Sequence, residues 1–232
     1  MYWKWGKGKR RPTGTYKIGM ETIAKSEEEK DLGVTILDSL SPEKHINRIY
    51  GSTYSMLINI RVAFTYMDNE MMRKIISTMI RPRLEYAATV WSPHLRKHVM
   101  KLERVQRAAT RMVPELANLQ YEERLKELNL PTLEERRERG DLIALHKLVN
   151  EIDEVDREDF VLRVDGRQQS TRGHSCKLRK PRCKSDVKKF SFPARCIDVW
   201  NQLQEEVVEA RTVSTFKGKL DKTRYRDRTP RV

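Results

Sequence analysis

The chain has 232 residues, of which 38% are hydrophobic, and its 47 basic and 33 acidic side chains leave a formal net charge of +14. This length is enough to bury a core of ordinary size, and a basic excess of this kind favours a polyanionic partner. The sequence has no run of about twenty apolar residues and no amino-terminal secretion signal, which excludes a transmembrane helix and favours the nucleus or the cytoplasm.

The amino-terminal part is predicted to contain β structure. Residues 1–15 are basic, include Pro12 and Gly14, and are typical of a disordered lead-in. Short segments of strand character surround a turn within residues 16–24, and a β-branched stretch of strand length covers residues 32–37. Residues 16–40 are therefore predicted to form a short β element.

After this element the apolar side chains recur with a period of 3.6, which predicts helices over residues 41–150. Asp68 can cap the second of them, and Pro82 should end or kink it, because proline lacks an amide and crowds the preceding turn. Thr132 and Glu135 have the spacing of a capping box, in which each satisfies an amide that the other leaves exposed. We expect these residues to form one helical domain.

The helix predicted over residues 95–113 has an apolar face and a basic face. Val99, Leu102 and Val105 fall on the apolar face. The candidate nucleic-acid-binding residues on its other side are Arg96, Lys97, Lys101, Arg104, Arg107 and Arg111. Solvated cations beside a core helix are common, and contact with a nucleic-acid backbone is the functional alternative.

Residues 151–189 lack helical periodicity and predict a flexible linker before a small helical tail at residues 190–232. From residue 163 the linker is basic, with ten basic and two acidic side chains, and it contains scattered Gly and Pro. Three of its cations, Lys177, Arg179 and Lys180, are further candidates for binding nucleic acid. The expected fold class is mainly α: a helical bundle, opened by the short β element and followed by this linker and tail.

Two residue patterns allow both a structural and a functional interpretation. The candidate zinc ligands are His174, Cys176, Cys183 and Cys196, but their gaps of one, six and twelve residues do not form the close pairs of structural zinc sites. Trp91 and Trp200 suit base stacking on a basic protein, whereas their apolar surroundings favour core anchors. We expect no catalytic residue, no metal site and no small-molecule substrate.

A series of phrases follows one order along the chain. Lys30-Asp31-Leu32-Gly33-Val34 comes first, then residues 80–93 (IRPRLEYAATVWSP) and residues 102–116 (LERVQRAATRMVPEL). Together with later phrases, these segments resemble the carboxy-terminal region of the reverse transcriptase of jockey-like non-LTR retrotransposons, over roughly residues 16–222. The resemblance implies a thumb-like helical bundle that follows the catalytic palm and grips template and primer. It implies a primer-grip-like position for Lys30, Leu32 and Gly33.

The resemblance also implies that this sequence lacks a feature that a polymerase needs for catalysis. The metal-binding aspartates of that family lie on a palm hairpin with an adjacent Asp-Asp pair, and no such pair occurs here. Phosphoryl transfer needs the divalent metals that those carboxylates hold, so magnesium belongs only to a complete polymerase. We expect a truncated, non-catalytic piece of an RNA-directed DNA polymerase that binds nucleic acid. The alternatives are a host-retained basic RNA- or DNA-binding protein and the non-functional product of a degenerate element.

Overall fold

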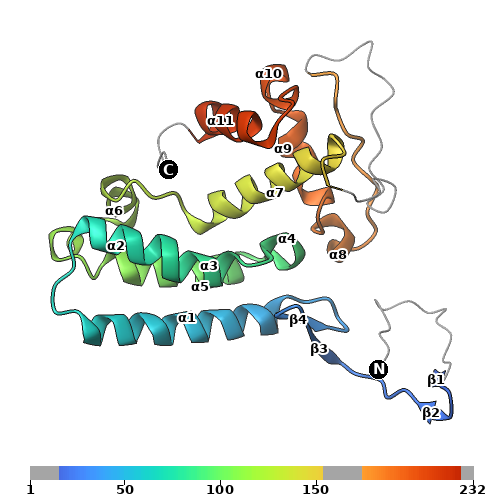
Figure 1. Ribbon diagram of the computed structural model, residues 1–232, viewed down its shortest axis with the longest axis horizontal. Helices are drawn as coiled ribbons and strands as arrows, with labels where there is room; N and C mark the ends of the chain where they lie inside the picture. Colours follow the sequence, from blue (N-terminus) through green and yellow to red (C-terminus); the bar gives the residue numbers. More distant parts are fainter. Residues whose placement is uncertain (1–15, 154–173, 226–232) are drawn as a thin grey trace.

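The computed structural model describes residues 16–153 and 174–225, and it confirms a mainly helical chain that opens with β hairpins (Figure 1). The strands are β1 Lys17–Ile18, β2 Glu21–Thr22, β3 Glu28–Asp31 and β4 Val34–Leu37. The helices are α1 Glu43–Ala63, α2 Asn69–Ile75, α3 Arg81–Glu85, α4 Ala88–Trp91, α5 Arg96–Thr110, α6 Tyr121–Glu127, α7 Leu133–Val149, α8 Asp186–Lys189, α9 Ile197–Asn201, α10 Glu205–Val208 and α11 Val213–Arg224. A π-helical turn covers Ile76–Ile80, and 3-10 turns cover Pro114–Leu116 and Ala194–Cys196.

The predicted β element consists of two antiparallel hairpins, β1–β2 and β3–β4. The sequence did not indicate β3, because its residues are charged and exposed on most positions. The β3–β4 turn is Leu32-Gly33, with φ of 42° and 86°, the two positive values that a tight mirror-type hairpin turn requires. The Thr35 amide donates to Nδ1 of the buried His45, which ties β4 to the first turn of α1.

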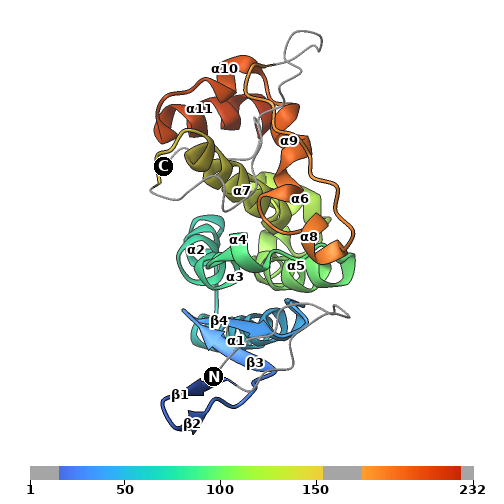
Figure 2. The same ribbon diagram turned by 90° about the vertical axis from the view of Figure 1, so that its right-hand side faces the viewer.

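The bundle is layered: α1 forms one outer layer, α2, α3 and α5 form the next, and α7 crosses beyond them (Figures 1 and 2). Apolar positions spaced three or four residues apart create the faces that meet between the layers. Ile46 and Leu57 of α1 lie against Leu102 and Val105 of α5 in one buried cluster. Trp91 belongs to this cluster, as predicted for a core anchor.

Pro82 was predicted to end or kink the second helix, and the structure has an irregular helical segment at this point. Asp68 caps α2 by accepting from the Met71 amide, and the chain then continues through the π-helical turn into α3, where Pro82 occupies the first turn. The widened turn before it lets one irregular helical segment run on to Glu85.

A second core joins the last helix of the predicted helical domain to the predicted tail. Leu142 and Leu145 of α7 pack with Trp200, Phe216 and other side chains of α9–α11, so the tail is built on α7 and the helical domain does not end at residue 150 as a separate unit. We call α7, residues 174–225 and this core the carboxy-terminal module. The predicted lead-in at residues 1–15 and linker residues 154–173 lie outside the described residues.

The later part of the predicted flexible linker is anchored to this module. His174 and Leu178 are buried, and Nε2 of His174 donates to the Trp200 carbonyl. The Asn201 side chain accepts from the Leu178 amide and donates to its carbonyl. This anchoring was not predicted from the sequence, because one buried leucine and one buried histidine among many cations form no periodic apolar pattern.

Candidate nucleic-acid interface

Helix α5 positions the basic residues that the sequence singled out. Val99, Leu102, Val105 and Ala109 are buried toward α1 and α7, which leaves the cations of the helix on its solvent side. A network of buried polar groups fixes this helix against its neighbours. The Gln106 side chain accepts from Arg81 Nε at 3.1 Å and donates to the Tyr121 hydroxyl and to the Pro131 carbonyl.

The ionisable groups of this network are buried, and the loss of hydration shifts their pKa values. Burial lowers the pKa of Arg81 to about 10, which still leaves the side chain charged at neutral pH. Burial raises the pKa of Glu103, whose carboxylate accepts from the Tyr121 hydroxyl and the Leu133 amide. Burial and the neighbouring Glu103 charge raise the pKa of Tyr121, which keeps its hydroxyl neutral as a donor. The network therefore stabilises the placement of α5 and leaves its exposed cations to other partners.

The predicted cations of α5 divide into two groups. Arg96 pairs with Glu134 at 3.1 Å and Lys97 with Glu43 at 3.4 Å, both on exposed surface. Lys101 donates to the Asn47 side chain at 2.6 Å, and its ammonium lies 5.1 Å from the centroid of the Tyr50 ring. These residues at the start and middle of the helix are engaged by side chains of α1 and α7.

The other group, Arg104, Arg107 and Arg111, lines a groove between the carboxy-terminal halves of α1 and α5. The groove has a volume of about 810 Å³. Its lining residues are Tyr50, Tyr54, Arg61, Phe64, Thr65, Met67, Arg104, Arg107, Ala108, Arg111 and Met112. No carboxylate is among them, so four arginines face this hollow without an acidic side chain in its wall. We call it the α1–α5 groove.

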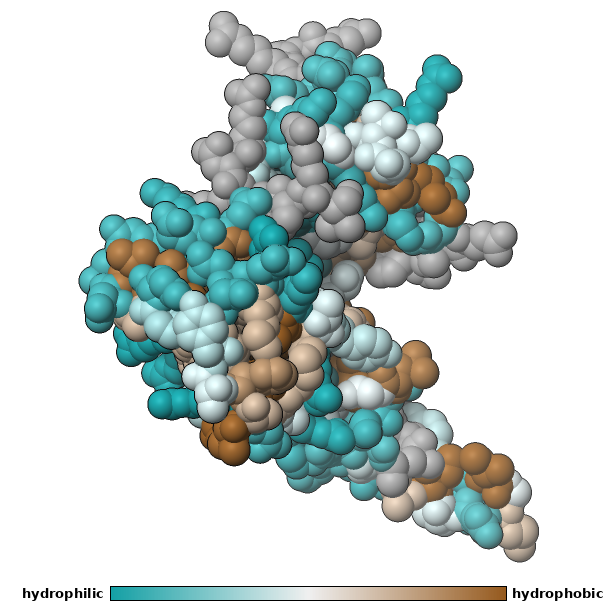
Figure 3. All heavy atoms as spheres, turned by 60° about the vertical axis from the view of Figure 1, so that its left-hand side comes forward, coloured by the Kyte–Doolittle hydropathy of each residue, from teal (hydrophilic) through white to brown (hydrophobic). Residues whose placement is uncertain are grey.

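Aromatic rings form the α1 side of this groove. The rings of Tyr50 and Tyr54 stack with centroids 5.5 Å apart, and Tyr54 and Phe64 are exposed. Several exposed apolar and aromatic side chains lie where α1 ends and the chain turns toward α2, on a molecule whose surface mixes hydrophobic and hydrophilic areas (Figure 3). Large exposed residues of this region include Val62, Phe64 and Tyr66. Exposed aromatic faces beside arginines are the combination that unpaired bases and their phosphates require.

The sequence did not identify Tyr54, Arg61 and Phe64 as site residues. Tyr54 and Arg61 lie on the exposed side of α1, and Phe64 directly follows the helix. The packing of α1 on α5 brings them opposite Arg104 and Arg111. The sequence signal that could have found Tyr54 and Arg61 is their position outside the apolar stripe of a long amphipathic helix.

The remaining predicted residues lie outside the groove. Lys177, Arg179 and Lys180 belong to the carboxy-terminal module, where Lys180 pairs with Asp198 beside α9, at the far end of the molecule from the last turn of α1 (Figure 1). Lys30, Leu32 and Gly33 form the exposed tip of the β3–β4 hairpin. The Tyr86 hydroxyl donates to the Leu32 carbonyl at 3.0 Å, which holds the tip against the end of α3.

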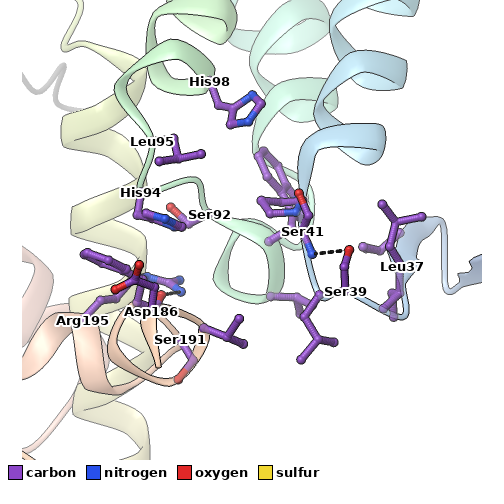
Figure 4. A pocket seen from close by; sticks show the side chains of 18 of the residues that line it. Leu37, Ser39, Ser41, Ser92, His94, Leu95, His98, Asp186, Ser191 and Arg195 are labelled. Carbon is purple, nitrogen blue, oxygen red and sulfur yellow. Dashed lines mark hydrogen bonds between the residues drawn. The ribbon is translucent and has the colours of Figure 1, made fainter. Parts of the chain in front are cut away.

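A second hollow, of about 350 Å³, lies where β4, the turn before α5 and the segment around α8 meet (Figure 4). The His94 ring stacks on Phe190 with centroids 4.2 Å apart, which joins the bundle to the carboxy-terminal module. Burial lowers the pKa of His98 at its edge, which favours the neutral form of this ring. Arg195 in its wall is already paired with Asp141. The hollow therefore offers no row of available cations for a phosphate backbone.

The candidate zinc ligands lie in the packed core and the loops of the carboxy-terminal module. His174 and Cys196 are buried in the carboxy-terminal module, and Cys183 donates to the Pro181 carbonyl. Among residues 16–153 and 174–225, no group of three or more potential ligands is arranged to hold a metal ion. Within the same ranges, no helix is both long and apolar enough to cross a membrane.

Comparison with known proteins gives no match: none of the family models, curated proteins or solved structures that were searched resembles this chain.

Proposed function

We propose that this protein binds nucleic acid in the α1–α5 groove, chiefly through phosphates and with weak sequence preference. The observation that carries the proposal is a groove lined by four arginines and by exposed aromatic rings, with no carboxylate among its lining residues. Guanidinium groups remain charged at any physiological pH and donate to phosphate oxygens with a planar fork. The net charge of +14 adds a long-range attraction toward any polyanion.

The groove suits a single strand better than a duplex. Stacking of an unpaired base on an aromatic side chain contributes about 1–3 kcal/mol per base, and it needs a base that is free of its partner strand. Tyr54 and Phe64 offer such faces beside Arg61. We expect bases to contact the α1 side of the groove and phosphates to contact the arginines of α5.

The sequence phrases support a larger proposed role for this nucleic-acid binding. We propose that the chain is the thumb-side, non-catalytic part of an RNA-directed DNA polymerase of the jockey-like retrotransposon type. The order of the phrases, the basic charge and the helical architecture support this role. The absence of an adjacent aspartate pair in the sequence supports a role in gripping rather than in chemistry.

The aromatic wall of the groove favours a second candidate, a basic RNA- or DNA-binding protein that acts apart from reverse transcription. A polymerase thumb should bind an RNA–DNA hybrid with a recessed primer at least as tightly as a single strand. An independent single-strand binder should prefer the unpaired strand. Competition between these two ligands of equal length therefore separates the candidates.

The groove itself is tested with two charge-matched double variants. Arg61→Gln with Arg104→Gln removes two cations from opposite walls of the groove, whereas Arg96→Gln with Lys97→Gln removes two cations of α5 that already pair with carboxylates. Loss of two phosphate contacts should weaken binding of a single-stranded oligonucleotide by about an order of magnitude or more at 0.1 M salt. The control double variant should stay close to the parent protein. Equal weakening in both variants would mean that only overall charge matters and that the groove is not the site.

A further inference from the structure

A buried arginine lies next to the groove, and two of its three guanidinium nitrogens have no hydrogen-bond partner among the described residues. Arg124, on α6, is 1% exposed, and its Nε and Nη1 atoms have no hydrogen-bond partner among the residues that the structure describes. Most buried charged groups are paired, because an unpaired one loses its hydration without compensation. An arginine left in this state therefore points to an anion that binds from outside the chain.

Two further guanidinium groups gather around Arg124. The guanidinium carbon of Arg107 lies 4.5 Å from the centroid of the Tyr121 ring, and that of Arg124 lies 5.7 Å from the same centroid. Burial lowers the pKa of Arg124, the charges of Arg111 and Arg107 lower it further, and those of Tyr121 and Glu122 oppose the fall. We call Arg107, Arg111 and Arg124 the Arg124 cluster.

The cluster adjoins the groove of the proposed function but extends beyond it. Arg107 and Arg111 line the groove, whereas Arg124 comes from α6, after the turn that follows α5. The Tyr121 hydroxyl already donates to Glu103 and accepts from Gln106, so it does not serve the buried guanidinium. The like charges of Arg107, Arg111 and Arg124 repel one another. The Glu103 charge acts on Arg107 and the Glu122 charge on Arg124, which offsets part of this repulsion, and a doubly charged ligand would offset more of it.

We propose that the Arg124 cluster is a phosphate-binding site that takes a phosphate monoester or inorganic phosphate. A tetrahedral dianion has enough oxygens to accept from several guanidinium forks at once, whereas a carboxylate is planar and carries one charge. The exposed Arg107 and Arg111 admit the ligand, and the buried Arg124 donates to it from beneath. The inference deepens the proposed function, since a strand in the groove supplies such a phosphate at its end, yet its first test needs no nucleic acid.

That test compares thermal unfolding in sodium phosphate and in sodium chloride at equal ionic strength and pH. At a phosphate concentration of about ten times Kd, a site that exists only in the folded chain raises the unfolding temperature by about 3–6 °C for a chain of this size. Arg111→Gln should lose most of this shift. Arg83→Gln, which removes an exposed arginine of α3, should retain it in full.

Arg124→Met separates ligand binding from a structural role. Methionine fills much of the same space and removes the unpaired charge, so this variant should unfold at the same or a higher temperature than the parent in chloride, and should show no phosphate shift. If Arg124→Met does not fold, Arg111→Gln decides the matter, because its side chain is exposed. Absence of a phosphate shift in the parent protein, or a full shift in Arg111→Gln, would overturn the proposal.

A second arm identifies the source of the phosphate. A single-stranded oligonucleotide with a 5′-phosphate should bind the parent more tightly than the same oligonucleotide with a 5′-hydroxyl, and Arg111→Gln should bind the two alike. Equal affinity in the parent, with the inorganic phosphate shift retained, would assign the site to free phosphate. The groove variant Arg61→Gln with Arg104→Gln should keep the phosphate shift, so the failure of the groove and the failure of this cluster give different results.

Discussion

The ion pair between Arg195 and Asp141 is predicted to stabilise the carboxy-terminal module, and the hydrogen bond from Arg195 to the Thr89 carbonyl joins that module to the bundle. Arg195 donates to both carboxylate oxygens of Asp141 at 2.8 Å and to the Thr89 carbonyl at 2.8 Å, so one side chain joins α7, the turn before α9 and α4. The side chains are 15% and 8% exposed. Burial raises the pKa of Asp141, while the Arg195 charge opposes this rise.

Replacing Arg195 by methionine leaves the buried carboxylate without its partner. Breaking a buried pair from one side costs about 3–5 kcal/mol, which corresponds to a fall of about 6–20 °C in unfolding temperature for a chain of this size. Protonation of Asp141 limits the loss, because its pKa rises further once Arg195 is removed. The double variant Arg195→Met with Asp141→Leu should recover most of the lost stability, since it removes both charges.

Urea unfolding followed by circular dichroism measures these differences, and tryptophan fluorescence reports on both cores through Trp91 and Trp200. Lys180→Met is the control, because its pair with Asp198 is 49% and 59% exposed and should contribute less than about 1 kcal/mol. The reasoning is refuted if Arg195→Met unfolds within about 0.5 kcal/mol of the parent, or if the double variant is no more stable than the single one.

Three further predictions test other parts of the account. Burial lowers the folded-state pKa of His146 below 6.5, so the stability that the neutral ring contributes is complete above pH 6.5 and is lost as the pH falls through the folded pKa. His146→Gln retains a donor for the Ala210 carbonyl but does not titrate in this range. Its unfolding temperature should therefore fall less than that of the parent between pH 7 and pH 5. Tyr54→Ala and Phe64→Ala should each weaken single-strand binding by about 1–3 kcal/mol in fluorescence anisotropy, with less effect on duplex binding; equal losses on both ligands would argue against stacking. The purified chain should not extend a primer in magnesium or manganese, and template-dependent incorporation above that of a heat-killed sample would contradict this.

Periodicity and capping chemistry were sufficient to predict much of the helical bundle. The apolar spacing along α5 and the Thr132–Glu135 capping box describe interactions between residues a few positions apart, and the structure contains both. The continuation of the helix past Pro82 was not predictable in the same way, because it depends on a π-helical turn, which the apolar period of the sequence does not indicate.

The candidate site was predicted only on its α5 side. The helical period places Arg104, Arg107 and Arg111 on one face, but the opposite wall depends on how α1 crosses α5, which no local pattern determines. The burial of Arg124 is likewise a tertiary effect, since Glu122, Glu123 and Lys126 close to it in the sequence are charged. The anchoring of residues 174–178 depends on hydrogen bonds to Asn201, which lies 23 residues away from Leu178.

The salt dependence of single-strand binding tests the central claim most directly. Four phosphate contacts at the groove arginines would give a log–log slope of about −2.8 on a single strand, in addition to any contacts elsewhere on the basic surface. Arg61→Gln with Arg104→Gln should make the slope shallower by about 1.4, and Arg96→Gln with Lys97→Gln should leave it unchanged, with both proteins folded by circular dichroism. A groove variant that keeps the slope of the parent, or a control variant that loses as much as the groove variant, would contradict the assignment of nucleic-acid binding to the α1–α5 groove.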